Sequence, residues 1–324
     1  MPKRAVVLIS GGLDSALAAK VINLQGVEVF GLAFITPFMH PRIEELGQNM
    51  GIQIRTIDVS SEYLDIIKNP RFGFGKNLNP CIDCHIFMLK KAKEIMPEYK
   101  ADFVISGEVL GQWPMSQNRA ALKKIEAESG LAGLLLRPLS ALLLSKTIPE
   151  QEGWVERDRL LGFSGRSRKP QMELVNQLGL KGFSQPAGGC LLTDAGFSKR
   201  LRDLMIYQRE FNLDDVRLLK TGRHFRLSAQ AKLILGRNRE ENQRLLESVS
   251  AGDFFLQPKD VSGPSGILKT RVISQELLEL SSGILGRYCD RSNGRIYVSI
   301  EGNKENQVIH CPALEPQEVD MLRI

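Results

Sequence analysis

No apolar run in this 324-residue sequence approaches the length of about 20 residues that a membrane-spanning helix requires. The longest runs cover residues 131–136 and 139–144, and Arg137 separates them. The start, Met-Pro-Lys-Arg, leads directly into the first predicted strand, which leaves no room for a secretion signal with its apolar segment. We therefore expect a cytoplasmic protein without a membrane partner.

Cysteine is scarce, with five residues in the whole sequence, and the odd number argues against a framework of disulfides. Metal-binding or catalytic thiols are the expected use of cysteine in such a chain. The net charge is a modest +6, but residues 199–247 hold twelve Lys or Arg against seven Asp or Glu. This basic segment indicates a polyanion such as RNA as a partner, although a solvated helix surface of mixed charge has the same composition.

A loop with the sequence Ser-Gly-Gly-Leu-Asp-Ser joins a predicted strand at 5–9 to a predicted helix at 14–24. Adjacent glycines let backbone N–H groups approach an anion, and the serine hydroxyls and the helix N-terminus add further attraction for phosphate. The loop lacks the lysine of G-x-x-x-x-G-K-[ST], which excludes the usual γ-phosphate chemistry of that motif. We expect ATP here, and the alternative is a glycine turn with serine caps. The loop residues are Ser10, Gly11, Gly12, Leu13, Asp14 and Ser15.

The first half of the chain alternates apolar strands with helical stretches, and the second half does not. Strands are predicted at 5–9, 27–34, 53–59 and 103–106, and helices at 14–24, 41–50 and 86–95. This alternation predicts an α/β fold with a parallel sheet and a ligand site at the carboxyl ends of its strands. We place a first domain at 1–195 and a smaller α+β domain at 196–324, with helices at 197–211 and 239–249 and strands at 216–220, 224–227, 231–235, 296–300 and 307–311.

Cys81 and Cys84 have the C-x-x-C spacing that lets two thiolates bind one ion. The pair alone also allows a redox dithiol, or a zinc site that would need further ligands. A third thiol, Cys190, follows a glycine turn at 185–189, and three thiols on two loops suit three irons of a 4Fe–4S cluster whose fourth iron is open. The alternative for Cys190 is a small buried residue. Asp83, between the paired thiols, is a candidate general base or a surface carboxylate.

Five segments together resemble the catalytic part of tRNA thiouridine synthetases, which are PP-loop ATPases, with the nearest likeness to the iron–sulfur-dependent ThiI-like and MnmA-like groups. The segments are 10–15, 80–85 (PCIDCH), 106–117, 137–140 and 186–193 (PAGGCLLT). The resemblance covers 3–194 and implies an adenine nucleotide alpha hydrolase-like fold, with Ser106 and Gly107 added to the nucleotide site. Residues 214–265 resemble NFACT-R, an RNA-associated domain.

The resemblance implies an ATP-dependent tRNA uridine sulfurtransferase that uses Mg²⁺. A uridine carbonyl oxygen would be adenylated, and a hydrosulfide on the open iron of a cluster held by Cys81, Cys84 and Cys190 would displace AMP. In the alternative, Cys84 or Cys190 carries a persulfide and the other cysteine resolves it. Further alternatives are a non-thiolating PP-loop tRNA-modifying enzyme and an RNA-binding protein with a zinc knuckle. Uridine 8 and uridine 34 both stay open as targets.

Capture of tRNA is expected to fall to the second domain, where Phe225 is predicted to enter the core while nearby cations contact phosphate. The candidate RNA contacts are Arg223, Arg226, Lys232, Arg237 and Arg239. In the first domain the candidate contacts to base or phosphate are Gln112, Ser116, Gln117, Arg137 and Lys146. The sulfur donor, which is sulfide or a persulfide carrier protein, and the oligomeric state, with a homodimer among the alternatives, stay open.

Overall fold

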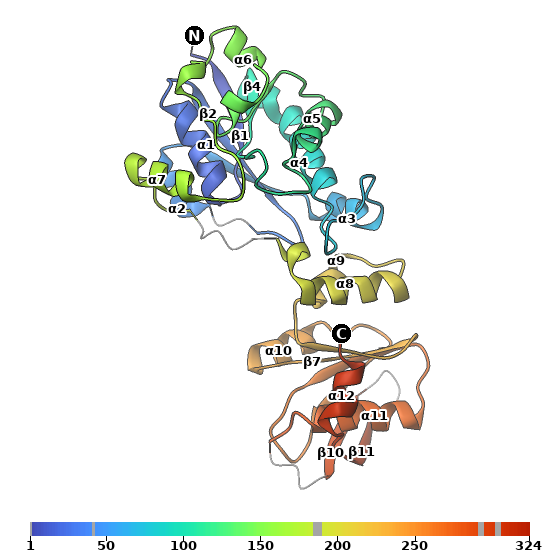
Figure 1. Cartoon of the computed structure of the whole chain (residues 1–324). Coiled ribbons are helices and arrows are strands. Elements are labelled where there is room, and N and C mark those ends of the chain that lie inside the picture. Colours follow the sequence, from blue (N-terminus) through green and yellow to red (C-terminus); the bar gives the residue numbers. More distant parts are fainter. Residues whose placement is uncertain (1, 41–42, 184–189, 291–294, 302–305) are drawn as a thin grey trace. The chain divides into compact units, whose positions relative to one another are not determined.

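The chain folds into two compact units, residues 1–193 and 194–324, each with its own sheet (Figure 1). The structure, a computed structural model, describes residues 2–40, 43–183, 190–290, 295–301 and 306–324. Among these residues, no helix is long and apolar enough to cross a bilayer.

The first unit is built on a parallel five-stranded sheet, which confirms the α/β fold that the alternating pattern predicts. The strand order is β3-β2-β1-β4-β5, so β1 lies between β2 and β4. Ala5 of β1 pairs with Val29 on one side and with Phe103 on the other. The strands are β1 (Arg4–Leu8), β2 (Glu28–Ile35), β3 (Ile54–Asp58), β4 (Phe103–Ile105) and β5 (Leu135–Leu136).

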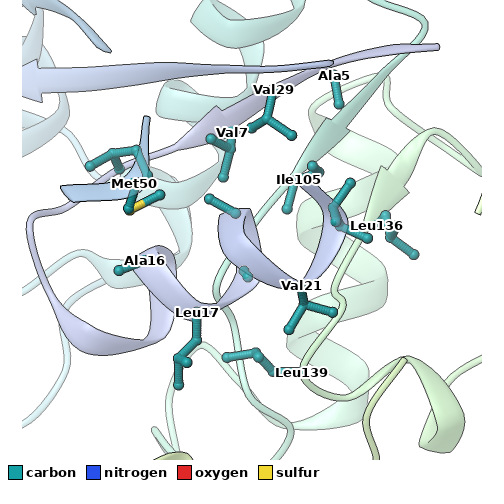
Figure 2. Packing of buried hydrophobic residues seen from close by; sticks show 14 of the residues in the cluster. Ala5, Val7, Ala16, Leu17, Val21, Val29, Met50, Ile105, Leu136 and Leu139 are labelled. Atoms are coloured by element: carbon teal, nitrogen blue, oxygen red, sulfur yellow. The ribbon is translucent and has the colours of Figure 1, made fainter. Parts of the chain in front are cut away.

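Helix α1 (Leu13–Asn23) is buried on almost every side and forms the core that supports the phosphate loop. Ala16, Leu17 and Val21 of α1 belong to one buried cluster with Val7 and Ile105 of the sheet, and Figure 2 shows Leu17 and Val21 on the side of α1 that faces away from the sheet, toward Leu139. A helix that is apolar all round lies inside a domain, and α1 is in contact with the sheet on one side and with α2 and α7 elsewhere. The other helices of the unit are α2 (Glu44–Met50), α3 (Ser60–Lys68), α4 (Cys81–Ile95), α5 (Arg119–Glu128), α6 (Ile148–Gln151) and α7 (Lys169–Leu178).

One predicted helix boundary is wrong in a way that matters for the thiols. The sequence predicts a loop at 81–85 and a helix from Ile86, but α4 begins at Cys81. Pro80 precedes the helix, where its lack of an N–H costs no hydrogen bond. Cys81 and Cys84 therefore lie in the first turn of a helix, three residues apart and on the same side.

The second unit is the α+β domain that the change in pattern predicts, with a six-stranded antiparallel sheet in the order β11-β10-β8-β9-β7-β6. Phe225 is fully buried in its core, as predicted. The predicted strand at 216–220 is wrong, because Asn212 and Asp215 form a capping box that starts a helix there. The elements are α8 (Ala195–Tyr207), α9 (Leu213–Leu218), β6 (Arg223–Ser228), β7 (Ala231–Leu235), α10 (Arg239–Glu247), β8 (Asp253–Pro258), β9 (Gly266–Thr270), α11 (Gln275–Gly286), β10 (Arg295–Glu301), β11 (Asn306–Pro312) and α12 (Pro316–Leu322).

Candidate active site

The loop between β1 and α1 holds its shape through its own serines. The Ser15 hydroxyl donates to the Gly12 carbonyl at 3.0 Å and lies 3.2 Å from the Ser10 hydroxyl. Gly11 has a φ of 78°, a backbone conformation that side chains other than glycine rarely adopt. The turn ends at the N-terminus of α1, so backbone N–H groups and the positive end of the helix face the same side.

A second loop, which follows β4, lies directly against the first. A methyl group added to Gly107 would be 2.5 Å from the Ser15 nitrogen and 2.6 Å from the Asp14 carbonyl carbon. Only glycine allows this approach, because both opposing atoms belong to the backbone of α1. Parallel strands β1 and β4 end side by side, which explains why the two loops meet.

A pocket of about 360 Å³ opens where these loops meet. The predicted nucleotide-binding residues Ser10, Gly12, Leu13, Asp14, Ser15, Ser106 and Gly107 line it. Its other walls come from the carboxyl end of β2, from α3 and from the start of α4, and include Leu32, Phe34, Thr36, Tyr63, Asn79 and His85.

All three predicted thiols, Cys81, Cys84 and Cys190, line this same pocket. The Asn79 amide donates to the Cys81 sulfur at 3.1 Å. Burial raises the pKa of Cys84 to about 12, against the lowering effect of its hydrogen bond with Tyr63, and burial raises the pKa of Cys190 to about 11. Within the described ranges, no three His, Cys, Asp or Glu side chains are placed so that together they could hold a metal ion. The predicted glycine turn at 185–189 lies outside the described residues.

The position of Asp83 does not fit the predicted role of a general base. Its carboxylate accepts hydrogen bonds from the backbone N–H groups of Arg71 and Phe72, at 3.0 and 3.1 Å. Asp83 is not among the described residues that line the pocket. The side chain between the two thiols therefore anchors the loop before α4, because the helix directs it away from the face that carries the sulfurs.

Tyr63 is a pocket residue that the sequence analysis missed. It is 2% exposed, packs against the rings of Phe38 and Phe87, and its hydroxyl is hydrogen-bonded to Cys84. Burial, together with the nearby thiols, raises its pKa well above the ordinary tyrosine value, so this hydroxyl stays a hydrogen-bond donor. Nothing in the local sequence marks this residue, because α3 brings it to the thiols across the fold.

A buried ionic network supports the wall next to Cys84. Glu108 accepts from Arg137 Nε at 2.8 Å and from the Ser106 hydroxyl at 2.9 Å, and its other oxygen lies 2.8 Å from His85 Nδ1. Burial alone would raise the pKa of Glu108, but the charges and hydrogen bonds of Arg137 and His85 outweigh it and hold that pKa well below the usual range. Arg137 also pairs with Glu126 at 3.0 Å.

This network corrects the expectation that Arg137 contacts base or phosphate. Its side chain is 3% exposed and is bound to two carboxylates inside the domain. The Gln112 side chain also has a partner inside the domain, because its amide donates a hydrogen bond to the Asp14 carboxylate at 2.7 Å.

We expect Arg137→Met to lower the free energy of unfolding by about 3–5 kcal/mol, because it leaves the buried Glu108 carboxylate without its main counter-charge. Urea denaturation followed by tryptophan fluorescence measures the loss. Arg159→Met is the matched control, since Arg159 pairs with Glu156 at an exposed site and its loss should cost less than about 1 kcal/mol. Equal effects of the two substitutions would contradict a structural role for the network.

Several of the side chains predicted to contact RNA form hydrogen bonds or ion pairs with other groups of the second unit. Asp203 accepts from Arg226 at 2.7 Å and from Lys232 at 2.9 Å, and the Lys232 side chain is only 8% exposed. This corrects the expectation of a displayed cation at Lys232, because β7 places it under α8. Arg237 pairs with Glu241, and Arg223 donates to the Gly236 carbonyl. Arg239 is exposed at the start of α10, and the Arg237 side chain is half exposed beside its partner. RNA contacts by Arg223, Arg226, Arg237 and Arg239 stay predictions.

His224 makes the stability of the second unit depend on pH. Its Nε2 donates to the Thr221 carbonyl at 2.9 Å, and burial, with the charges of Lys232 and Arg200, lowers its pKa well below 6.5. The unfolded chain binds a proton below about pH 6.5 while the folded unit does not, so stability is full above that pH and falls as the pH drops below it.

We expect the protection of the amides of residues 223–235 against hydrogen exchange to weaken between pH 6.5 and 5. The slope should approach about 1.4 kcal/mol per pH unit, after correction for the intrinsic exchange rate. His224→Gln keeps a donor for Thr221 but has no titratable ring, so its slope should be flatter. Identical slopes for the two proteins would show that His224 does not control this dependence.

Comparison with known proteins gives these sites a context. Residues 2–148 match the family model described as thiamine biosynthesis protein (ThiI), and residues 222–322 match the model described as NFACT protein RNA binding domain. The two matched segments lie in different units of the chain. The NFACT-R match is longer than the resemblance seen in the sequence and covers β10, β11 and α12.

Curated relatives match parts of the chain. A tRNA-specific 2-thiouridylase MnmA of Nitratiruptor is 27% identical over 33% of this chain and 35% of its own length. A probable tRNA sulfurtransferase of Finegoldia magna is 32% identical over 43% of this chain and 36% of its own length. The chain thus spans less than half the length of these relatives.

Proposed function

We propose that this protein is an ATP-dependent tRNA uridine sulfurtransferase. The observation that carries the proposal is that three thiols from two distant segments line the same pocket as the Ser10–Ser15 loop. A loop that binds ATP would allow adenylation of a uridine carbonyl oxygen. Thiols beside this loop could then deliver sulfur to the carbon that carries the adenylated oxygen. The relatives named above as thiouridylase and sulfurtransferase, and the ThiI-type match over 2–148, support the same class of reaction.

The first step uses the glycine loop. Ser10, Gly11, Gly12 and Ser15 bind the pyrophosphate part of ATP through N–H and hydroxyl groups, and the Asp14 carboxylate would hold the Mg²⁺ that accompanies a nucleotide. The uridine carbonyl oxygen attacks the α-phosphorus, the bond between the α-phosphorus and the bridging oxygen breaks, and pyrophosphate leaves. The oxygen uses a lone pair for the new bond to phosphorus, ring nitrogen N3 releases its proton, and a carbon–nitrogen double bond replaces the carbonyl bond, so this oxygen becomes the leaving group of the second step.

The second step needs sulfur within reach of the activated carbon. A hydrosulfide attacks that carbon, the carbon–oxygen bond breaks, and AMP leaves with its oxygen. A 4Fe–4S cluster, when bound, would supply an open iron that holds the hydrosulfide. Cys81, Cys84 and Cys190 would hold such a cluster: the donor set is suitable, and the three side chains would have to turn toward one another because the described residues contain no preformed three-ligand site.

The persulfide route stays the alternative for the same cysteines. The terminal sulfur of a persulfide on Cys84 or Cys190 attacks the carbon, and the other thiol then attacks the inner sulfur and forms a disulfide, so a thiol reductant must restore the pair. The tRNA itself would be held by the NFACT-R domain, which we propose contacts the phosphate backbone through exposed cations such as Arg239.

Mass spectrometry of tRNA nucleosides tests the proposal. The full chain, purified under argon, is incubated with tRNA, Mg²⁺, ATP and either sulfide or a persulfide donor, and 4-thiouridine or 2-thiouridine is expected together with AMP and pyrophosphate. An ATP analogue with a methylene bridge between the α- and β-phosphorus should prevent the reaction, because that bond must break. Transcripts that carry cytidine at position 8 or position 34 identify the target uridine.

The same samples distinguish the two sulfur routes. Iron and acid-labile sulfide in equal amounts, with a Mössbauer spectrum of a 4Fe–4S centre, support the cluster. A peptide of Cys84 or Cys190 that is heavier by one sulfur atom, in iron-free active protein, supports the persulfide. Release of ADP and phosphate, or no thiolated nucleoside under either condition, would overturn the proposed function.

A further inference from the structure

Two buried glutamines from distant parts of the first unit form a hydrogen-bonded chain that ends at Asp14 of the Ser10–Ser15 loop. Gln171 Nε2 of α7 donates to Gln112 Oε1 at 3.0 Å, and Gln112 Nε2 donates to Asp14 Oδ2 at 2.7 Å. Gln171 is 1% exposed and Gln112 is 5% exposed. Asp14 lines the pocket, whereas neither glutamine is among the residues that do, so the glutamines stand behind the wall.

The charge of Asp14 determines the direction of every hydrogen bond in this chain. An ionised carboxylate only accepts, so Gln112 must turn its NH₂ group toward Asp14 and its oxygen toward Gln171. Gln171 must then present its own NH₂ group. This orientation leaves Gln171 Oε1 buried without a hydrogen-bond partner among the described residues. An apolar side chain would fill the same place without that defect, which argues that the amide is kept for what it does to Asp14.

The chain holds one carboxylate oxygen of Asp14, and the other oxygen has no hydrogen-bond partner among the described residues. Asp14 Oδ1 is buried and has no hydrogen-bond partner within the described residues, while Arg168 lies 4.0 Å from Oδ2. A buried carboxylate oxygen beside a phosphate-binding loop suits a hard cation, and the Mg²⁺ that travels with a nucleotide has the matching chemistry. The hydrogen bond to Oδ2 prevents the carboxylate from rotating about its axis.

We propose that Gln112 and Gln171 are positioning residues that orient Asp14 toward the Mg²⁺ of bound ATP. This inference rests on the proposed use of ATP and adds two residues that do not touch the substrate. Removal of a group behind a metal-binding carboxylate typically lowers metal affinity 10–100-fold, and we expect an effect in this range.

Binding of a fluorescent ATP analogue to the full chain, titrated with Mg²⁺ and without tRNA, tests the inference. Gln171→Met keeps the size but cannot donate, and Gln171→Glu turns an acceptor toward the Gln112 oxygen. Both should raise the Mg²⁺ concentration for half-maximal binding at least tenfold, with the larger shift for Gln171→Glu. Nucleotide affinity without Mg²⁺ should stay within about twofold, which a general loss of structure would not produce.

Gln25→Glu is the matched control, because Gln25 Oε1 accepts from the Glu156 N–H at 2.7 Å, away from the pocket, and a carboxylate can accept there too. Its Mg²⁺ dependence should equal that of the unmodified chain. If both Gln171 variants keep the unmodified Mg²⁺ dependence, the inference is wrong although the ATP function stands. If the variants lose nucleotide affinity equally with and without Mg²⁺, Gln171 is structural only. If the unmodified chain binds no ATP, the proposed function fails as well.

Discussion

Gly107→Ala is expected to reduce ATP affinity about 100-fold. The new carbon would lie 2.5 Å from the Ser15 nitrogen and 2.7 Å from the Asp14 carbonyl oxygen, distances that real side chains essentially never show. Both opposing atoms are backbone atoms of α1, so no side chain can turn aside. The loop after β4 and the phosphate loop must separate.

Separation of the two loops should lower ATP affinity more than it lowers the stability of the first unit. Overpacking at one position costs about 1–3 kcal/mol of stability, which a domain with this buried core can survive. Displacement of binding groups by about 1 Å can cost a factor of 100 at a site that works by positioning. Isothermal titration with ATP and Mg²⁺, combined with thermal denaturation, separates the two effects.

Gly162→Ala is the control for Gly107→Ala. The nearest atom to a methyl group on Gly162 is 3.6 Å away, an ordinary contact, so both its ATP affinity and its melting temperature should match those of the unmodified chain. Normal ATP affinity in Gly107→Ala would show that the contact between the two loops does not shape the nucleotide site.

Cys84→Ser and Cys190→Ser are each expected to abolish thiouridine formation, with a loss of about 1000-fold or more, while ATP-dependent pyrophosphate release continues. In the cluster route each thiol would be one of the three ligands of the cluster that supplies the hydrosulfide, and in the persulfide route one thiol carries the sulfur and the other releases the product, so sulfur transfer needs both. Both thiols line the pocket, but neither is part of the Ser10–Ser15 loop, to which we assign phosphate binding. Adenylation should therefore persist, and AMP would be released by hydrolysis. Nucleoside mass spectrometry and a pyrophosphate assay on the same sample measure both steps.

Cys289→Ser provides the control for the thiol substitutions. Cys289 belongs to the second unit, where its thiol lies against the Leu285 carbonyl, and its replacement should leave thiouridine formation unchanged. Thiolation at a normal rate in Cys190→Ser would remove this thiol from the reaction. Loss of pyrophosphate release in both pocket variants would mean that the thiols serve the nucleotide site instead.

Local sequence was sufficient for the features that depend on backbone chemistry and periodicity. The glycine turn between β1 and α1 could be predicted because two adjacent glycines stand between an apolar strand and an alanine-rich helix, and phosphate binding by this turn stays a prediction. The parallel sheet followed from alternating strands and helices, and the burial of Phe225 from alternation within a strand. The second domain followed from the loss of that alternation after about residue 194.

Only the tertiary structure decided which partner each polar side chain has. Arg137, Gln112 and Lys232 are indistinguishable in sequence from exposed residues that contact a ligand, yet each is buried and bound to a carboxylate at least 29 positions away. The same holds for Asp83 and Tyr63. Asp83 is a candidate general base in the sequence but lies outside the pocket, whereas Tyr63, which no motif marks, lines the pocket. The pairing of strands and the packing of helices decide which side chains lose water together, and a buried charge must then find its counter-charge wherever the chain has placed it.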